Sequence, residues 1–216
     1  MNRRMVIGSV ATLLALGVGT AQAAPTRQNG WYAGIDVSHS RLDMGGNNID
    51  QAFANQGITS ATSVGRTDTG WGVDLGYRFG PHFALEGGYT NLGEFSYTSA
   101  ATVPGVDSLQ GTFKAHAWWL APVGIVPLTD RWALFGKAGL TRVTADLSAS
   151  SSTGATAPSG MSHSNAGWLL GAGTSYDFTR NVYAKLEWDR FARVGDTNTT
   201  ARGNVDQLGI GIGWRF

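Results

Sequence analysis

The last nine residues, LGIGIGWRF, alternate large apolar side chains with glycine. A period of two is that of a β-strand, in which successive side chains point to opposite faces. One face carries Leu208, Ile210, Ile212, Trp214 and Phe216, and the other carries Gln207, Gly209, Gly211, Gly213 and Arg215. Glycine on a water-exposed face weakens a strand, so the rest of the chain must show which face points inward.

Seven earlier segments show a similar alternation and are predicted strands: residues 31–42, 70–79, 83–90, 113–127, 132–144, 167–178 and 182–189. In the fourth segment we expect Ala117, Trp119 and Ala121 to face outward, Lys114 and His116 to face inward, and Pro122 to mark a bulge. Short connections (80–82, 128–131, 179–181) alternate with long ones (42–69, 93–112, 146–165, 192–204). Eight strands of about ten residues with this asymmetry are typical of the smallest common outer-membrane barrels.

Aromatic residues fall at two heights along these strands. A first set lies at strand ends beside the short turns: Trp31, Phe79, Phe83, Trp132, Phe178 and Phe216. A second set lies several residues further along the strands: Trp71, Tyr89, Trp119, Trp168 and Trp188. Two such sets are expected where aromatic rings form belts at the two membrane interfaces.

The predicted fold is therefore all-β, an eight-stranded antiparallel up-and-down transmembrane barrel with its apolar face in lipid. A closed barrel leaves no strand edge unpaired in a medium without water. Glycines would then face a narrow lumen and relieve crowding there. The alternative fold is a soluble lipocalin-like barrel, which would partition without detergent.

The amino terminus resembles a secretory signal peptide. Arg3 and Arg4 precede an apolar run that is shorter than the roughly 20 residues of a membrane helix, and Ala21-Gln22-Ala23 fits a cleavage site. We expect a signal peptide at residues 1–23 and a barrel domain at residues 24–216. The full chain has 16 basic and 15 acidic residues. Removal of the signal peptide takes away two arginines and leaves 14 basic against 15 acidic residues. Such a balance does not favour nucleic-acid binding, and the absence of cysteine excludes disulfides and thiolate metal sites.

Charged residues on the predicted inner face form the candidate functional site. They are Asp36, Asp74, Glu86, Glu187, Asp189, Arg78, Lys137, Lys185 and Arg215. Unpaired charges in a narrow lumen are costly, so we expect a salt-bridge network across the barrel. Such a network could be a plug that stabilises a closed barrel, or a gate whose partners exchange to admit small ions.

Two other function classes are open. His163 with Ser164, His116, and His39 with Ser40 are candidates for a lipid A-modifying enzyme. His163 and Ser164 are adjacent in a serine-rich segment, and no acid stands near them in the sequence to orient a catalytic pair. The long polar loops, above all residues 148–164, could instead act in a surface adhesin or receptor. We find no metal-ligand spacing and no nucleotide-binding loop, and expect neither cofactor nor metal.

Several motifs resemble the transmembrane domain of outer membrane protein A and its small-barrel relatives. They are Trp31-Tyr32-Ala33-Gly34, Leu85-Glu86-Gly87-Gly88-Tyr89, residues 134–139 (LFGKAG), residues 184–188 (AKLEW) and the closing residues 208–216. The resemblance implies an interior cluster of acids and bases that gates the lumen, with Glu86 and Lys185 at matching places. The chain departs from this pattern at two places. Residues 121–123 contain no lysine where the family has one, and Ser175 stands where the family has an acid. Lys137 with Glu187 is the expected substitute.

The resemblance also implies that Trp214 and the terminal Phe216 form the signal read by the barrel-assembly machinery. We thus expect a monomeric, non-enzymatic protein of the Gram-negative outer membrane, surrounded by lipids and lipopolysaccharide. Its expected role is envelope integrity with a possible narrow, gated ion path.

Overall fold

A computed structural model describes residues 29–43, 47, 50–51, 54–55, 57, 59–103, 107–151, 161–196 and 201–216. The predicted signal peptide lies outside these residues. The strands are β1 (Gly30–Asp43), β2 (Thr59–Val64), β3 (Thr67–Arg78), β4 (Phe83–Val103), β5 (Asp107–Pro127), β6 (Trp132–Ser151), β7 (Met161–Asp177), β8 (Val182–Asp196) and β9 (Ala201–Arg215). Among the described residues, no helix is long and apolar enough to cross a membrane.

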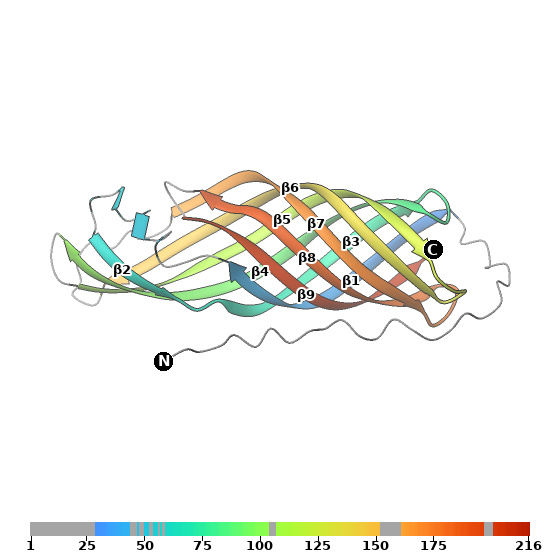
Figure 1. The fold of residues 1–216 in the computed structure, drawn as a ribbon, viewed down its shortest axis with the longest axis horizontal. Helices are drawn as coiled ribbons and strands as arrows, with labels where there is room; N and C mark the ends of the chain where they lie inside the picture. Colours follow the sequence, from blue (N-terminus) through green and yellow to red (C-terminus); the bar gives the residue numbers. More distant parts are fainter. Residues whose placement is uncertain are drawn as a thin grey trace, which may run out of the picture.

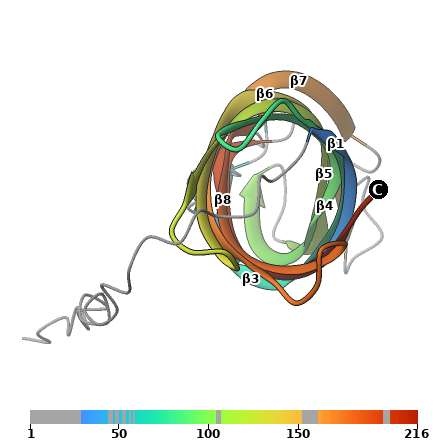
Figure 2. The same cartoon turned by 90° about the vertical axis from the view of Figure 1, so that its right-hand side faces the viewer.

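Eight of these strands form a closed antiparallel barrel (Figures 1 and 2). Each pairs with its neighbours in sequence, β1 pairs with β9, and the β4–β5 pairing completes the ring. The short turns between β3 and β4, β5 and β6, and β7 and β8 lie together at one end, with the carboxyl terminus (Figure 1). The predicted eight-stranded barrel is confirmed.

The outer surface beside the short turns is apolar. On β9, Leu208, Ile210 and Ile212 are each more than half exposed, and the same holds for Ile35 and Val37 on β1. A contiguous apolar surface that encircles a barrel is stable only in an apolar surrounding. The apolar face of the closing strand therefore points outward, as its glycine-bearing opposite face predicted.

Inward-facing glycines make room for large rings from the neighbouring strand. Gly76 lies opposite Tyr32, and a Cβ atom at Gly76 would collide with the Tyr32 ring. Gly213 stands in the same relation to Tyr183. A small lumen can hold these tyrosines because the facing residue has no side chain.

The strands extend much further from the short turns than the sequence predicted. Residues 93–103 and 107–112, interpreted as a loop, belong to β4 and β5, which have 21 residues each. In this region the polarity is reversed: Phe95 and Phe113 are buried inside while Ser96 and Thr98 are exposed outside. The loop interpretation was wrong because the strands were predicted from an apolar face directed toward lipid. Where the outside of the barrel wall meets water, the apolar residues lie on the inner face instead.

The two faces of β5 were also assigned the wrong way round. Trp119 is only 8% exposed and faces the lumen, so it is not part of an aromatic belt, whereas its neighbour Trp118 is 63% exposed on the outside. Lys114 likewise faces outward. Two adjacent tryptophans fit either alternation, so the pattern alone does not determine which one faces lipid. The small residues Ala117 and Ala121, predicted to face lipid, line the crowded interior instead.

The register places the bulges away from the predicted site. Pro122 pairs opposite Leu85 with no register shift. Shifts occur instead between Asn91 and Gly93 on β4, and between Phe191 and Val194 on β8. Gly93 has a φ of 105°, a conformation that favours glycine at such an irregularity.

A ninth strand, β2, was not predicted. It pairs with the far end of β4, from Tyr97 to Val103, beyond the end of β3. Asp50 holds it through hydrogen bonds to both the backbone and the hydroxyl of Thr62 and to Ser60. Its sequence, TSATSV, is too polar for a membrane strand, and its place beyond β3 explains why a search for apolar alternation missed it.

Candidate functional site

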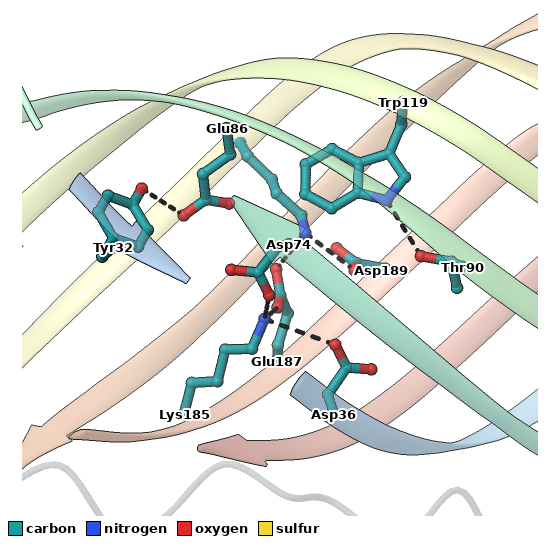
Figure 3. Close-up of polar contacts among 10 residues, drawn as sticks. Tyr32, Asp36, Asp74, Glu86, Thr90, Trp119, Lys185, Glu187 and Asp189 are labelled. Atoms are coloured by element: carbon teal, nitrogen blue, oxygen red, sulfur yellow. Dashed lines mark hydrogen bonds and ion pairs between the residues drawn. The ribbon is translucent and has the colours of Figure 1, made fainter. Parts of the chain in front are cut away.

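The middle of the lumen holds a charged cluster built from four strands. Lys185 of β8 lies at its centre, with Nζ 2.6 Å from Asp74 Oδ1, 3.3 Å from Glu187 Oε2 and 3.6 Å from Asp36 Oδ1 (Figure 3). The side chain of Lys185 is 8% exposed and that of Asp74 is 2% exposed. The three carboxylates come from β1, β3 and β8, so the network ties together strands that are distant in the sequence.

Lys137 of β6 forms the second half of this cluster. Its Nζ lies 2.5 Å from Glu187 Oε1 and 3.0 Å from Asp189 Oδ2, and its side chain is 1% exposed. The same ammonium group stands 4.3 Å from the centre of the Trp119 ring, a cation–π geometry. Glu187 therefore bridges the two lysines, and the predicted pairing of Lys137 with Glu187 is present.

Glu86 does not take the role that the family pattern suggested. It accepts a hydrogen bond of 2.6 Å from the Tyr32 hydroxyl (Figure 3), and among the residues described no ion pair joins it to Lys185. Arg78 lies nearer the short turns, where its guanidinium donates to the carbonyl oxygens of Gly80 and Pro81. These two side chains therefore border the cluster rather than form its centre.

The space around the cluster is small. A cavity of about 50 Å³ touches Tyr32, Glu86 and Lys185, and another of about 10 Å³ touches Asp36, Ser38 and Asp189. A buried water needs about 10–15 Å³, so these cavities have room for a few waters. At the short-turn end a wider vestibule of about 760 Å³ opens, lined by Arg78, Arg215 and the turn residues.

On the other side of the cluster the barrel is filled by an apolar plug. Its larger fully buried side chains are Leu42, Leu92, Phe95, Phe113, Val143, Leu169, Phe191, Val194 and Val205. Each of them is at most 1% exposed, so the interior at this level is packed side chain against side chain. Ions that entered from the vestibule would meet the salt bridges first and then this apolar plug.

The predicted belt residues other than Trp119 lie on the outer surface of the barrel. Trp31, Phe79, Phe83, Trp132, Phe178 and Phe216 are exposed beside the short turns, and Trp71, Trp168 and Trp188 are exposed further along the wall with Tyr89 half-buried among them. Tyr89 contacts Trp118 at a ring distance of 5.1 Å, so Trp118 takes the belt position given to Trp119.

Sequence reasoning gave no lumen role to three aromatic residues, Tyr32, Trp119 and Tyr183. Tyr32 donates a hydrogen bond to Glu86, and Trp119 donates a 3.0 Å hydrogen bond to Thr90 Oγ1 (Figure 3). The Tyr183 ring lies against the guanidinium of Arg215, which pairs with Asp177 at 2.9 Å. Glycines opposite Tyr32 and Tyr183 were the available signal for two of them. Within the described part of the chain, no group of three or more His, Asp or Glu residues is arranged to hold a metal ion.

Residues 11–216 match the family described as the outer membrane protein beta-barrel domain. The chain belongs to this family. It is 28% identical to outer membrane protein A of Serratia marcescens over 213 residues, and 29% identical to that of Salmonella typhi over 213 residues. These alignments cover 96% of this chain and 55% and 54% of the relatives, so the chain spans about half their length.

Solved barrels of this kind share the fold. The attachment invasion locus protein Ail of Yersinia pestis, in complex with the heparin analogue sucrose octasulfate, aligns with a TM-score of 0.52 at 17% identity, over 88% of this chain and 99% of that one. Neisserial surface protein A aligns with a TM-score of 0.55 at 16% identity, over 87% and 97%. Together the family match and the fold identify an outer-membrane β-barrel of the type found in outer membrane protein A.

Proposed function

We propose that this barrel is a monomeric structural component of the outer membrane whose lumen does not conduct ions. The observation that carries the proposal is the series of two barriers inside it: the salt bridges of Lys137 and Lys185, and the apolar plug around Phe95, Phe113 and Phe191. Of the two earlier interpretations, plug or gate, the packing favours the plug. Exchange of ion-pair partners alone would not open the apolar segment.

Planar-bilayer conductance tests this proposal. We expect no channel current from the refolded wild-type protein or from Lys185→Ala, because the apolar plug is intact in both. A matched variant, Phe95→Ala with Phe113→Ala and Phe191→Ala, removes side chains from the plug and is expected to conduct only when combined with Lys185→Ala. Discrete wild-type currents, or currents from Lys185→Ala alone, would show that the cluster is a gate.

A non-enzymatic role is part of the proposal, and the positions of the histidines support it. His163 and Ser164 are consecutive on β7, and His39 and Ser40 are consecutive on β1, so each pair points to opposite faces of the wall. A nucleophile and its base must lie within hydrogen-bond reach. The Ser40 hydroxyl is buried and accepts a hydrogen bond from Gln207. Lipid A of unchanged mass after incubation with the protein is the expected result.

Surface attachment is a second candidate, favoured by the length of the wall. The hairpin of β4 and β5 extends far from the short turns (Figure 1). Beyond the apolar band its outward side chains, such as Ser96 and Thr98, are polar, which would raise its tip above the membrane surface. Attachment of cells that express a variant without residues 98–110 tests this role. Recognition of Trp214 and Phe216 by the assembly machinery, cleavage after residue 23 and envelope support remain proposals of the same kind.

A further inference from the structure

The outer face of β6 carries a cation at the level of the aromatic belt that lies further from the short turns. Arg142 is exposed and lies directly opposite Trp118 of β5 on one side and Ala166 of β7 on the other. Trp118 is 63% exposed and Trp168, diagonal to Arg142 on β7, is 43% exposed. Because tryptophan rings of barrels lie at the headgroup level, the guanidinium is placed at the same depth.

Arg142 differs from other outward-facing cations of the wall in its surroundings. Lys114 pairs with Glu94 at 3.0 Å, and Arg190 pairs with Asp206 at 2.8 Å. No residue next to Arg142 on the outer face is acidic: these neighbours are His116, Trp118, Leu120, Leu140, Thr144, Ser164, Ala166 and Trp168. Within the part of the chain that the structure describes, Arg142 makes no ion pair.

A cation at a membrane interface without a protein partner needs an anion from its surroundings. Arginine matches a phosphate group particularly well, since its planar guanidinium can donate two parallel hydrogen bonds. The residues below Arg142 on the same face, Leu140 at 76% and Leu120 at 57% exposed, offer an apolar surface that fits acyl chains. Phosphate above acyl chains is the chemistry of a phosphorylated lipid.

We propose that Arg142, between Trp118 and Trp168, binds a phosphate group of lipid A in the outer leaflet. The inference rests on the proposed function in one respect, that the long hairpins face the cell exterior, where lipopolysaccharide lies. His116, whose ring is 5.7 Å from that of Tyr89, lies one step further from the membrane centre and borders the site. The proposed ligand is therefore a phosphorylated glycolipid, and the site lies on the outer wall, separate from the lumen.

The test measures binding of lipid A to the refolded protein in detergent by native mass spectrometry. Four ligands are compared: lipid A with both phosphates, the same lipid A after enzymatic removal of both phosphates, phosphatidylglycerol, and inorganic phosphate. Three variants accompany the wild type: Arg142→Gln, Arg142→Lys, and the matched control Lys114→Gln, which removes a cation that already has a partner. Gel migration with and without heating shows that each variant is folded.

We expect Arg142→Gln to bind bisphosphorylated lipid A about tenfold more weakly, the effect of one charge-assisted hydrogen-bonded contact. Arg142→Lys should lose less, Lys114→Gln should bind as the wild type does, and dephosphorylated lipid A should not distinguish the variants. Equal binding of lipid A by wild type and Arg142→Gln would overturn the proposal. So would an equal loss with dephosphorylated lipid A, or saturation by inorganic phosphate or phosphatidylglycerol at the same concentration. None of these outcomes bears on conductance, so this inference and the sealed lumen fail separately.

Discussion

Replacement of Lys137 by methionine tests the energetic role of the charged cluster. Methionine keeps an unbranched side chain in a site that is 1% exposed, but it removes the ammonium group that lies 2.5 Å from Glu187 and 3.0 Å from Asp189. Lys185 still contacts Glu187, so Asp189 loses its only ion-pair partner among the described residues. Removal of one partner of a buried ion pair costs about 3–5 kcal/mol, because the remaining charge stays buried without compensation.

We therefore expect the free energy of unfolding of Lys137→Met to fall by about 3–5 kcal/mol. The assay is urea unfolding of the refolded barrel in phospholipid vesicles, followed by tryptophan fluorescence, with linear extrapolation to zero denaturant. Lys114→Met is the control, since Lys114 and Glu94 are 57% and 46% exposed and an exposed pair contributes only about 0–1 kcal/mol.

The double variant Lys137→Met with Glu187→Gln shows whether electrostatics is the cause. Once Lys137 is replaced, the charge of Glu187 lacks one of its two partners, and the second change removes that charge. The two changes together should therefore lower the free energy of unfolding by about 1–3 kcal/mol less than the sum of the single changes. A Lys137→Met protein within about 1 kcal/mol of the wild type, or strictly additive costs, would falsify the view that the cluster is a stabilising network.

Two further predictions concern residues that sequence reasoning misplaced. Trp119→Phe removes the 3.0 Å hydrogen bond to Thr90 and weakens the contact with Lys137, and should lower the free energy of unfolding by about 1–3 kcal/mol, whereas Trp118→Phe on the lipid side should change it by less than about 1 kcal/mol. Equal effects in the urea assay would contradict the assignment of the two faces. Burial raises the pKa of Tyr97 to about 12, from 10.0, so the folded state holds this proton where the unfolded state releases it. The stability advantage of wild type over Tyr97→Phe should therefore be complete below pH 10 and decline between pH 10 and about 12, with a tyrosinate absorbance step near pH 12 that the variant lacks.

The sequence determined the architecture of the membrane-spanning part of the barrel. Alternation at a period of two, glycine on one face and short turns at every second connection predicted eight strands and identified the lipid-facing side of seven of them. These signals are local, because each strand must present an apolar face to lipid whatever its neighbours are. The same alternation placed the charged residues in the lumen, since they lie on the strand face opposite the apolar one.

Tertiary structure decided which face of β5 points toward lipid, how far the strands extend beyond the membrane, and which charged residues of the lumen pair with each other. Trp118 and Trp119 are adjacent, so only the neighbours across the sheet, Tyr89 outside and Thr90 inside, determine which ring faces lipid. Beyond the membrane the outside of the wall meets water, and apolar side chains such as Phe95 turn inward to form the plug. Which carboxylate meets which lysine depends on the registers of strands far apart in the chain, and Lys185 finds Asp74 across 111 residues because closure of the barrel brings them together.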